Sequence, residues 1–153
     1  MMTNVEKTLL EKNLVIPACP VPIASYVPAR VEGRFVYLSG QTAWVDGVLQ
    51  YKGKLGEEIS TEDGYESAKL AALRCISELR SVADLDKVRI VKVTGYVNSA
   101  PDYVDQPKVV NGASDLFVLA FGEKGRHARA AIGMSALPDG ASVEVEAIAY
   151  IEE

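Results

Sequence analysis

The sequence has few of the residues that build metal sites and disulfide frameworks. Its 153 residues include one histidine and two cysteines, Cys19 and Cys75, which stand far apart and form no CxxC motif. A structural zinc site needs about four histidine or cysteine ligands. We therefore predict no bound metal and no cofactor, and two reduced thiols. Cys75 is expected in the protein core, because it falls within an apolar stripe.

Long apolar runs and an excess of positive charge are also missing. No apolar run approaches the length of about 20 residues that crosses a membrane, and residues 1–7 lack the apolar centre of a secretion signal. The sequence therefore predicts a cytoplasmic protein without a membrane partner. Its 16 basic against 21 acidic residues give a net charge of -5. This balance argues against a nucleic-acid partner, which needs a basic face to bind phosphate.

The length and the apolar content of 48% are typical of one globular domain spanning residues 1–153. Residues 1–20 are expected to form a short helix followed by a proline-rich lead-in. Thr3 and Glu6 have the spacing of a capping box at the start of that helix. Pro17, Pro20 and Pro22 then prevent the helix from continuing, because proline lacks the backbone N–H.

Two longer helices and five strands are predicted beyond the lead-in. Ser60 and Asp63 fit the start of the longest helix. Its apolar stripe comprises Tyr65, Ala68, Ala72, Cys75, Leu79 and Val82. The next helix begins at Pro107 and ends at Gly122. The expected strands cover residues 25–32, 34–41, 88–99, 129–136 and 143–151, and residues 41–58 are interpreted as a loop with one short strand. This order predicts an α+β fold with both helices on one sheet face.

The last two strands are predicted to form a β-hairpin around the turn residues Pro138, Asp139 and Gly140. In that pairing Arg129 lies on the same face as Glu144 and Glu146. Two interpretations are open here. The arginine forms a solvated pair with a glutamate, or its planar guanidinium binds a ligand carboxylate or phosphate in the space left by small neighbours.

The face that carries Arg129 is expected to have no helix over it. The residues expected on this face are Arg129, Ala131, Gly133, Glu144 and Tyr150. A partly polar, uncovered sheet face is either solvated or packed against another copy of the chain.

Several of these residues together resemble one protein family. They are Tyr26 after Ala24-Ser25, Ser39-Gly40-Gln41, Asn111, and Arg129 with Leu137-Pro138 and residues 143–147. This pattern resembles the Rid family of reactive intermediate deaminases, also called YjgF or endoribonuclease L-PSP, over about residues 21–151. The closing segment is the most specific part of the resemblance. The extra N-terminal helix and the longer loop after Gln41 suggest a longer, divergent branch.

The resemblance implies a chorismate-mutase-like α+β fold, with a mixed β-sheet and two helices on one face, and a homotrimer with clefts between subunits. It also implies hydrolysis of 2-imino or 2-enamino acids to 2-keto acids and ammonia. Arg129 corresponds to the arginine that grips the substrate carboxylate. Tyr26 and Glu144 correspond to further catalytic residues, and Gly40 and Asn111 to further substrate-binding residues.

Ala131 occupies a substrate-binding position that is often cysteine or threonine in this family. If the backbone carbonyl plays the role of this position, alanine suffices; if the side chain plays it, reduced activity is expected. Two alternatives remain. A trimer of this kind can bind a small carboxylate without turning it over. The family's older name suggests an endoribonuclease, against which the acidic charge and the single histidine argue. That histidine, His127, is expected on the strand face of Arg129, as a surface or interface residue.

Overall fold

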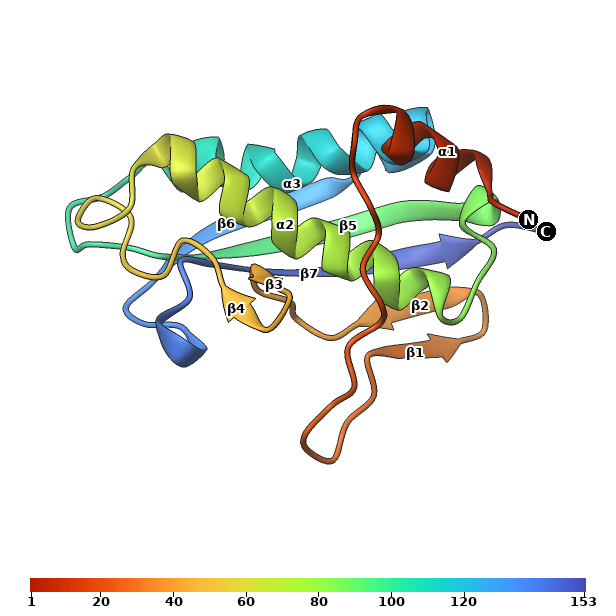
Figure 1. Ribbon diagram of the computed structural model, residues 1–153, viewed down its shortest axis with the longest axis horizontal. Helices are drawn as coiled ribbons and strands as arrows, with labels where there is room; N and C mark the ends of the chain where they lie inside the picture. Colours follow the sequence, from red (N-terminus) through yellow and green to blue (C-terminus); the bar gives the residue numbers. More distant parts are fainter.

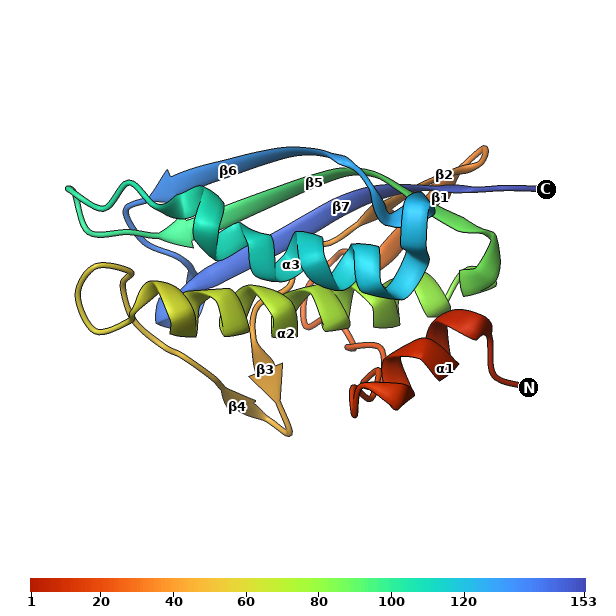
Figure 2. The same ribbon diagram turned by 90° about the horizontal axis from the view of Figure 1, so that it is seen from above.

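The computed structural model describes all residues, 1–153, and shows one layer of helices on one twisted sheet (Figure 1). The elements are α1 (Asn4–Glu11), β1 (Ala29–Glu32), β2 (Phe35–Leu38), β3 (Trp44–Val45), β4 (Val48–Leu49), α2 (Thr61–Arg80), β5 (Val88–Asn98), α3 (Gln106–Phe121), β6 (Ala128–Met134) and β7 (Val143–Ile151). The main sheet has the order β1-β2-β7-β5-β6. Figure 2 shows α2 and α3 side by side on one face, with no helix on the other. The predicted α+β class and the single helical layer are confirmed.

The helices begin where the sequence predicts, and α3 also ends there. The end of α2 differs, because the helix stops at Arg80 and Val82 of the expected apolar stripe lies beyond it, 39% exposed. Thr3 and Glu6 form both hydrogen bonds of the capping box at α1, and Ser60 caps α2 by accepting a bond from the backbone N–H of Asp63. Pro107 lies in the first turn of α3, where its missing N–H has no partner to lose. Gly122 ends that helix with a φ of 63°, which glycine adopts without steric cost. None of the helices combines the length and the apolar character needed to cross a membrane.

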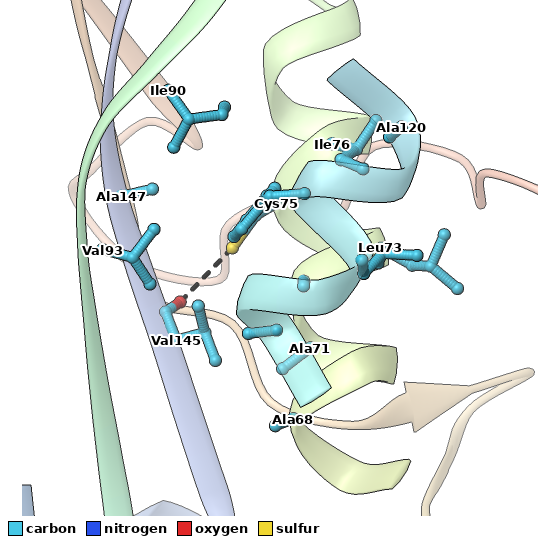
Figure 3. Close-up of a cluster of buried hydrophobic side chains, with 14 of the residues drawn as sticks. Ala68, Ala71, Leu73, Cys75, Ile76, Ile90, Val93, Ala120, Val145 and Ala147 are labelled. Atoms are coloured by element: carbon cyan, nitrogen blue, oxygen red, sulfur yellow. Dashed lines mark hydrogen bonds between the residues drawn. The ribbon is translucent and has the colours of Figure 1, made fainter. Parts of the chain in front are cut away.

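The core lies between the two long helices and the sheet (Figure 3). Its alanines and glycines let the layers approach closely: a Cβ added at Gly95 of β5 would lie 2.5 Å from a methyl group of Val110 in α3. Cys75 is fully buried, as predicted, and its thiol donates a hydrogen bond to the carbonyl of Val145 at 3.4 Å. Burial raises the pKa of the Cys75 thiol well above its usual value, so it stays protonated.

The predicted closing hairpin is wrong, because β6 and β7 do not pair with each other. Instead, β5 lies between them: it pairs in parallel with β6 and antiparallel with β7. The physical reason is the helix α3 between β5 and β6. A strand–helix–strand unit returns the second strand parallel to the first, and this leaves the other edge of β5 for β7.

This pairing also reverses the predicted position of Arg129. Arg129 is level with Val93 and Ala147, whose side chains are buried against the helices, and it contacts α3 directly. Glu144 is level with Tyr96 and lies on the open face. The expectation that Arg129 shares a face with Glu144 and Glu146 is therefore wrong.

The open face also differs from the prediction in its composition. Ala131 and Gly133 lie with Arg129 on the helical side, where Ala131 packs against the core. Glu144 and Tyr150 do lie on the open face, together with Phe35, which contacts the ring of Tyr150 edge-on at 5.1 Å between centroids. The open face is therefore richer in aromatic side chains than predicted.

Residues 41–58 contain two short strands rather than one. The strands β3 and β4 form a small hairpin, and both residues of its turn, Asp46 and Gly47, have positive φ. This is the turn that suits a two-residue hairpin. The first two strands are shorter than predicted, although they pair antiparallel around Gly33 as expected.

Candidate functional site

Arg129 is half-buried on the edge strand β6, and only neutral groups hold its guanidinium. Nη1 donates to Oδ1 of Asn111 at 2.8 Å and to Oγ of Ser114 at 3.2 Å, while Nη2 donates to the carbonyl of Pro107 at 3.4 Å. All three acceptors belong to α3. None of the ion pairs in the structure involves Arg129. Its position is therefore fixed, and its guanidinium forms no ion pair, although Asp115 lines the same cleft as Arg129.

His127 supports this arrangement from the side. Its Nδ1 hydrogen-bonds the carbonyl of Gly125 at 2.7 Å, and its Nε2 lies 2.9 Å from Oγ of Ser114. A carbonyl only accepts, so Nδ1 carries the proton and Nε2 accepts the proton of Ser114. Burial lowers the pKa of His127, which favours this neutral form. His127 thus orients Ser114 toward Arg129, on the same side of β6, beside a cleft of about 450 Å³.

Tyr26 and Gly40 lie in a second cleft, of about 320 Å³, between the proline-rich lead-in and the end of β2. Glu144 of β7 covers Gly40 from the open face. A Cβ at residue 40 would lie 3.0 Å from Cδ of Glu144 and 3.2 Å from its Oε1. Glycine at this position therefore lets the carboxylate of Glu144 approach the backbone closely.

Glu144 is partly buried, and two effects favour its protonated form. Burial is the larger cause that raises the pKa of Glu144, and the neighbouring charge of Glu146 adds to it. Glu146 accepts a hydrogen bond from the hydroxyl of Tyr96, which raises the pKa of Tyr96 to about 12. A carboxyl group with a raised pKa is a stronger proton acceptor when it is ionised, which suits the activation of a water molecule.

The predicted site residues fall into two groups within one chain. Arg129 and Asn111 meet at the edge strand β6, on the helical side of the sheet. Tyr26, Gly40 and Glu144 gather around the end of β2, which lies on the other side of β5 and β7 in the sheet. Within one chain, Arg129 and Asn111, the candidate residues for binding the substrate carboxylate, are therefore separated from Glu144, the candidate residue for activating water.

A third group was not predicted from the sequence. Gln41 accepts a hydrogen bond from Nε of Arg74 at 3.0 Å and donates one to Oε2 of Glu78 at 3.1 Å. Arg74 and Glu78 are four residues apart on α2, so the spacing that places two charges on one helix face was the available signal. Ser114 was missed too, although it stands one helical turn after Asn111. No group of three or more histidine, cysteine, aspartate or glutamate residues is arranged to hold a metal ion.

A family model described as "YjgF/chorismate_mutase-like, putative endoribonuclease" matches residues 6–149 of the chain. The chain belongs to this family. The resemblance inferred from the sequence is thus confirmed, and the match includes most of the N-terminal helix.

Three known proteins are similar to this chain over most of its length. Protein TCP17 of Trypanosoma cruzi is 39% identical over 148 residues, which cover 95% of this chain and 92% of the relative. The protein Atu1372 from Agrobacterium tumefaciens has a crystal structure and is described as a protein of unknown function. It is 37% identical to this chain, and the two structures superpose with a TM-score of 0.91 over 97% of this chain and 92% of that chain. The bovine protein named 2-iminobutanoate/2-iminopropanoate deaminase is 29% identical over 93% of this chain and 91% of its own length.

Proposed function

We propose that this protein hydrolyses 2-imino or 2-enamino acids to 2-keto acids and ammonia. The observation that carries the proposal is the state of Arg129, whose guanidinium is fixed by three neutral acceptors and has no acidic partner. Such a guanidinium is ready to bind a carboxylate through two parallel hydrogen bonds. The name of the bovine relative, an imine deaminase, supports the same chemistry.

In this proposal Arg129 and Asn111 fix the substrate carboxylate, and Glu144 orients the attacking water. An imine carbon is already electrophilic, so orientation of the two reactants supplies much of the rate acceleration. Glu144 takes a proton from water as the new C–O bond forms and the C=N π electrons move to the nitrogen, and it passes this proton to the nitrogen. In the resulting carbinolamine, Glu144 transfers the hydroxyl proton to the nitrogen, the C–N bond breaks, and ammonia leaves as the keto carbonyl forms. Tyr26 closes the side of the cleft next to Gly40, and the backbone carbonyl of Ala131 is a further acceptor on the strand of Arg129.

The separation of the two residue groups supports assembly into a homotrimer. One chain does not bring Arg129 to Glu144, so we propose that the cleft forms where Arg129 of one subunit faces Glu144 of the next. The open sheet face offers surface for this assembly, since Phe35, Tyr37 and Ile132 are each more than 40% exposed in the single chain.

The test compares Arg129→Lys and Arg129→Ala with the parent protein, by calorimetry with 2-oxobutanoate and by an imine-hydrolysis assay. Both variants should lose about 2–4 kcal/mol of binding and transition-state stabilisation, because an ammonium does not reproduce the bidentate contact. Arg30→Lys, at an exposed ion pair with Glu32, is the matched control. If Arg129→Lys binds and turns over like the parent, the proposed carboxylate clamp is wrong.

The same assays separate the competing functions. Binding of 2-oxobutanoate without any acceleration of imine hydrolysis would identify a carboxylate-binding module rather than an enzyme. Ribonuclease activity is the function that the family description names. RNA cleavage that persists in purified protein and disappears in Arg129→Ala would favour the ribonuclease over the deaminase.

A further inference from the structure

Arg74 is a second arginine without an acidic partner, and it lines the cleft of Tyr26 and Gly40. It is half-buried on α2, where Nε donates to the side-chain carbonyl of Gln41 at 3.0 Å and Nη1 to the backbone carbonyl of Trp44 at 3.4 Å. It takes part in no ion pair. It is also the only basic residue on this cleft.

Glu78, one helical turn along α2 from Arg74, forms no ion pair with it. Glu78 is fully buried behind Gln41, which donates to its Oε2 at 3.1 Å, while its Oε1 has no hydrogen-bond partner. Burial raises the pKa of Glu78 to about 8, so the group is mostly protonated at neutral pH. Asp139 is the one acidic residue on the cleft, and it is exposed at the rim. The guanidinium of Arg74 therefore keeps a net positive charge in a partly desolvated position.

Arg74 is also rigidly connected to the candidate catalytic group. Its partner Gln41 exchanges two backbone hydrogen bonds with Val145, each of 2.9 Å. Gln41 follows Gly40, and Val145 follows Glu144, so two hydrogen-bonded segments carry Arg74's acceptor and the carboxylate over Gly40 side by side. An anion bound at Arg74 would thus occupy the cleft at whose edge Glu144 and Gly40 meet.

We propose that Arg74 binds a second carboxylate of the substrate, so that the substrates are 2-imino dicarboxylic acids. This inference rests on the proposed function, in which Arg129 binds the first carboxylate. A carboxylate fits better than a phosphate, because a phosphate dianion calls for several cationic or N–H donors and this cleft offers one guanidinium. The apolar prolines and Trp44 around Arg74 lower the local dielectric constant, which strengthens a single ion pair.

The test measures how strongly the protein prefers a dicarboxylate. Binding of 2-oxoglutarate and of 2-oxopentanoate, which have the same chain length, is measured by calorimetry, and hydrolysis of the matching imines is followed beside it. The parent should prefer the dicarboxylate by about tenfold, the worth of one charge-assisted contact. Arg74→Gln should bring this ratio close to one, and Arg74→Lys should restore part of it.

Arg80→Gln, at the ion pair with Glu6 on the same helix and outside this cleft, is the matched control and should keep the parent's ratio. A parent without preference, or an Arg74→Gln variant that loses both ligands equally, would overturn the inference, because the arginine would then only support the fold. The Arg129→Lys variant shows which proposal has failed. If a preference that depends on Arg74 persists while substitution of Arg129 changes neither binding nor turnover, the dicarboxylate site stands and the proposed function falls.

Discussion

At the scale of single residues, Glu78 has the most unusual environment in the chain. Its side chain is fully buried between α2 and the sheet, and only one of its two oxygens has a partner. A buried carboxyl group with so little hydrogen bonding is more stable in the protonated form. The folded structure therefore disfavours the ionised form of Glu78.

This environment makes stability depend on pH. The pKa of Glu78 is raised from 4.5 to about 8 in the folded state, whereas in the unfolded chain it returns to its ordinary value. Between these two values the unfolded state releases a proton that the folded state keeps. The contribution of Glu78 to the free energy of unfolding should therefore fall with rising pH, by up to about 1.4 kcal/mol per pH unit.

Urea unfolding of the parent and of Glu78→Gln at several pH values measures this contribution. Glu78→Gln should gain stability relative to the parent as the pH rises through this window, because an amide does not ionise. Glu66→Gln replaces an exposed glutamate of the same helix and should follow the parent at every pH. Identical pH profiles for parent and Glu78→Gln would show that Glu78 ionises normally in the folded protein.

Individual side chains were predicted unevenly from the sequence. Arg129 contacts Asn111, and the sequence resemblance assigned both residues to substrate binding. The sheet face of Arg129 was predicted wrongly. Side chains alternate between the two faces along a strand, so the face on which a residue lies depends on how its strand pairs with the neighbouring strand. The bond between Gln41 and Glu78 joins residues 37 positions apart, and no local pattern indicates such a contact.

At the scale of elements, the helices were easier to predict than the sheet. Each helix carries its own signals in its caps and its apolar stripe, so α2 and α3 could be located from nearby residues. Strand pairing depends on residues far away in the sequence. The turn at residues 138–140 suggested that β6 and β7 are neighbours, but the crossover through α3 decides the pairing by placing β6 beside β5.

The packing of the end of β2 against β7 leads to a second prediction. Gly40→Ala would place a Cβ 3.0 Å from Cδ of Glu144, so the Glu144 side chain must move. Because that side chain is flexible, we expect a loss of stability of about 1 kcal/mol or less. Imine hydrolysis should fall more steeply, since the moved carboxylate no longer holds water in place.

A double-mutant cycle with Glu144→Ala isolates this contact. The three atoms nearest to the added methyl group all belong to the Glu144 side chain. Once that side chain is removed, Gly40→Ala should cost less stability than in the parent background. The free energies of unfolding of the four proteins provide the measurement. An equal cost in both backgrounds would mean that residue 40 needs glycine for a reason other than Glu144.

At the scale of the whole molecule, one face of the sheet has no covering layer. Its exposed side chains include Phe35, Tyr37 and Ile132, while the opposite face is covered by α2 and α3 (Figure 2). The uncovered face could be predicted from the sequence, because no element remained to cover it. The arrangement of subunits could not, because alternation within a strand does not specify a partner molecule.

The proposed trimer gives the third prediction. Ile132→Asp places a charge on the open face of β6, and burying that charge between subunits is unfavourable. Sedimentation equilibrium should show the parent as a trimer and Ile132→Asp as monomers of 16.5 kDa. Val82→Asp, at a side chain 39% exposed against 42% for Ile132, should remain a trimer. A monomeric parent, or a trimeric Ile132→Asp, would rule out this interface.

The position of β7 has a consequence for how the chain folds during synthesis. This strand is synthesised after the other six strands, yet it lies in the middle of the sheet, between the β1–β2 hairpin and β5. Before residues 143–151 leave the ribosome, β1 and β2 are an isolated two-stranded hairpin, which is only marginally stable in water. The buried face of the sheet stays incomplete until these residues have emerged. Native structure should therefore appear in one late, cooperative step, at a rate limited by contacts between distant parts of the chain.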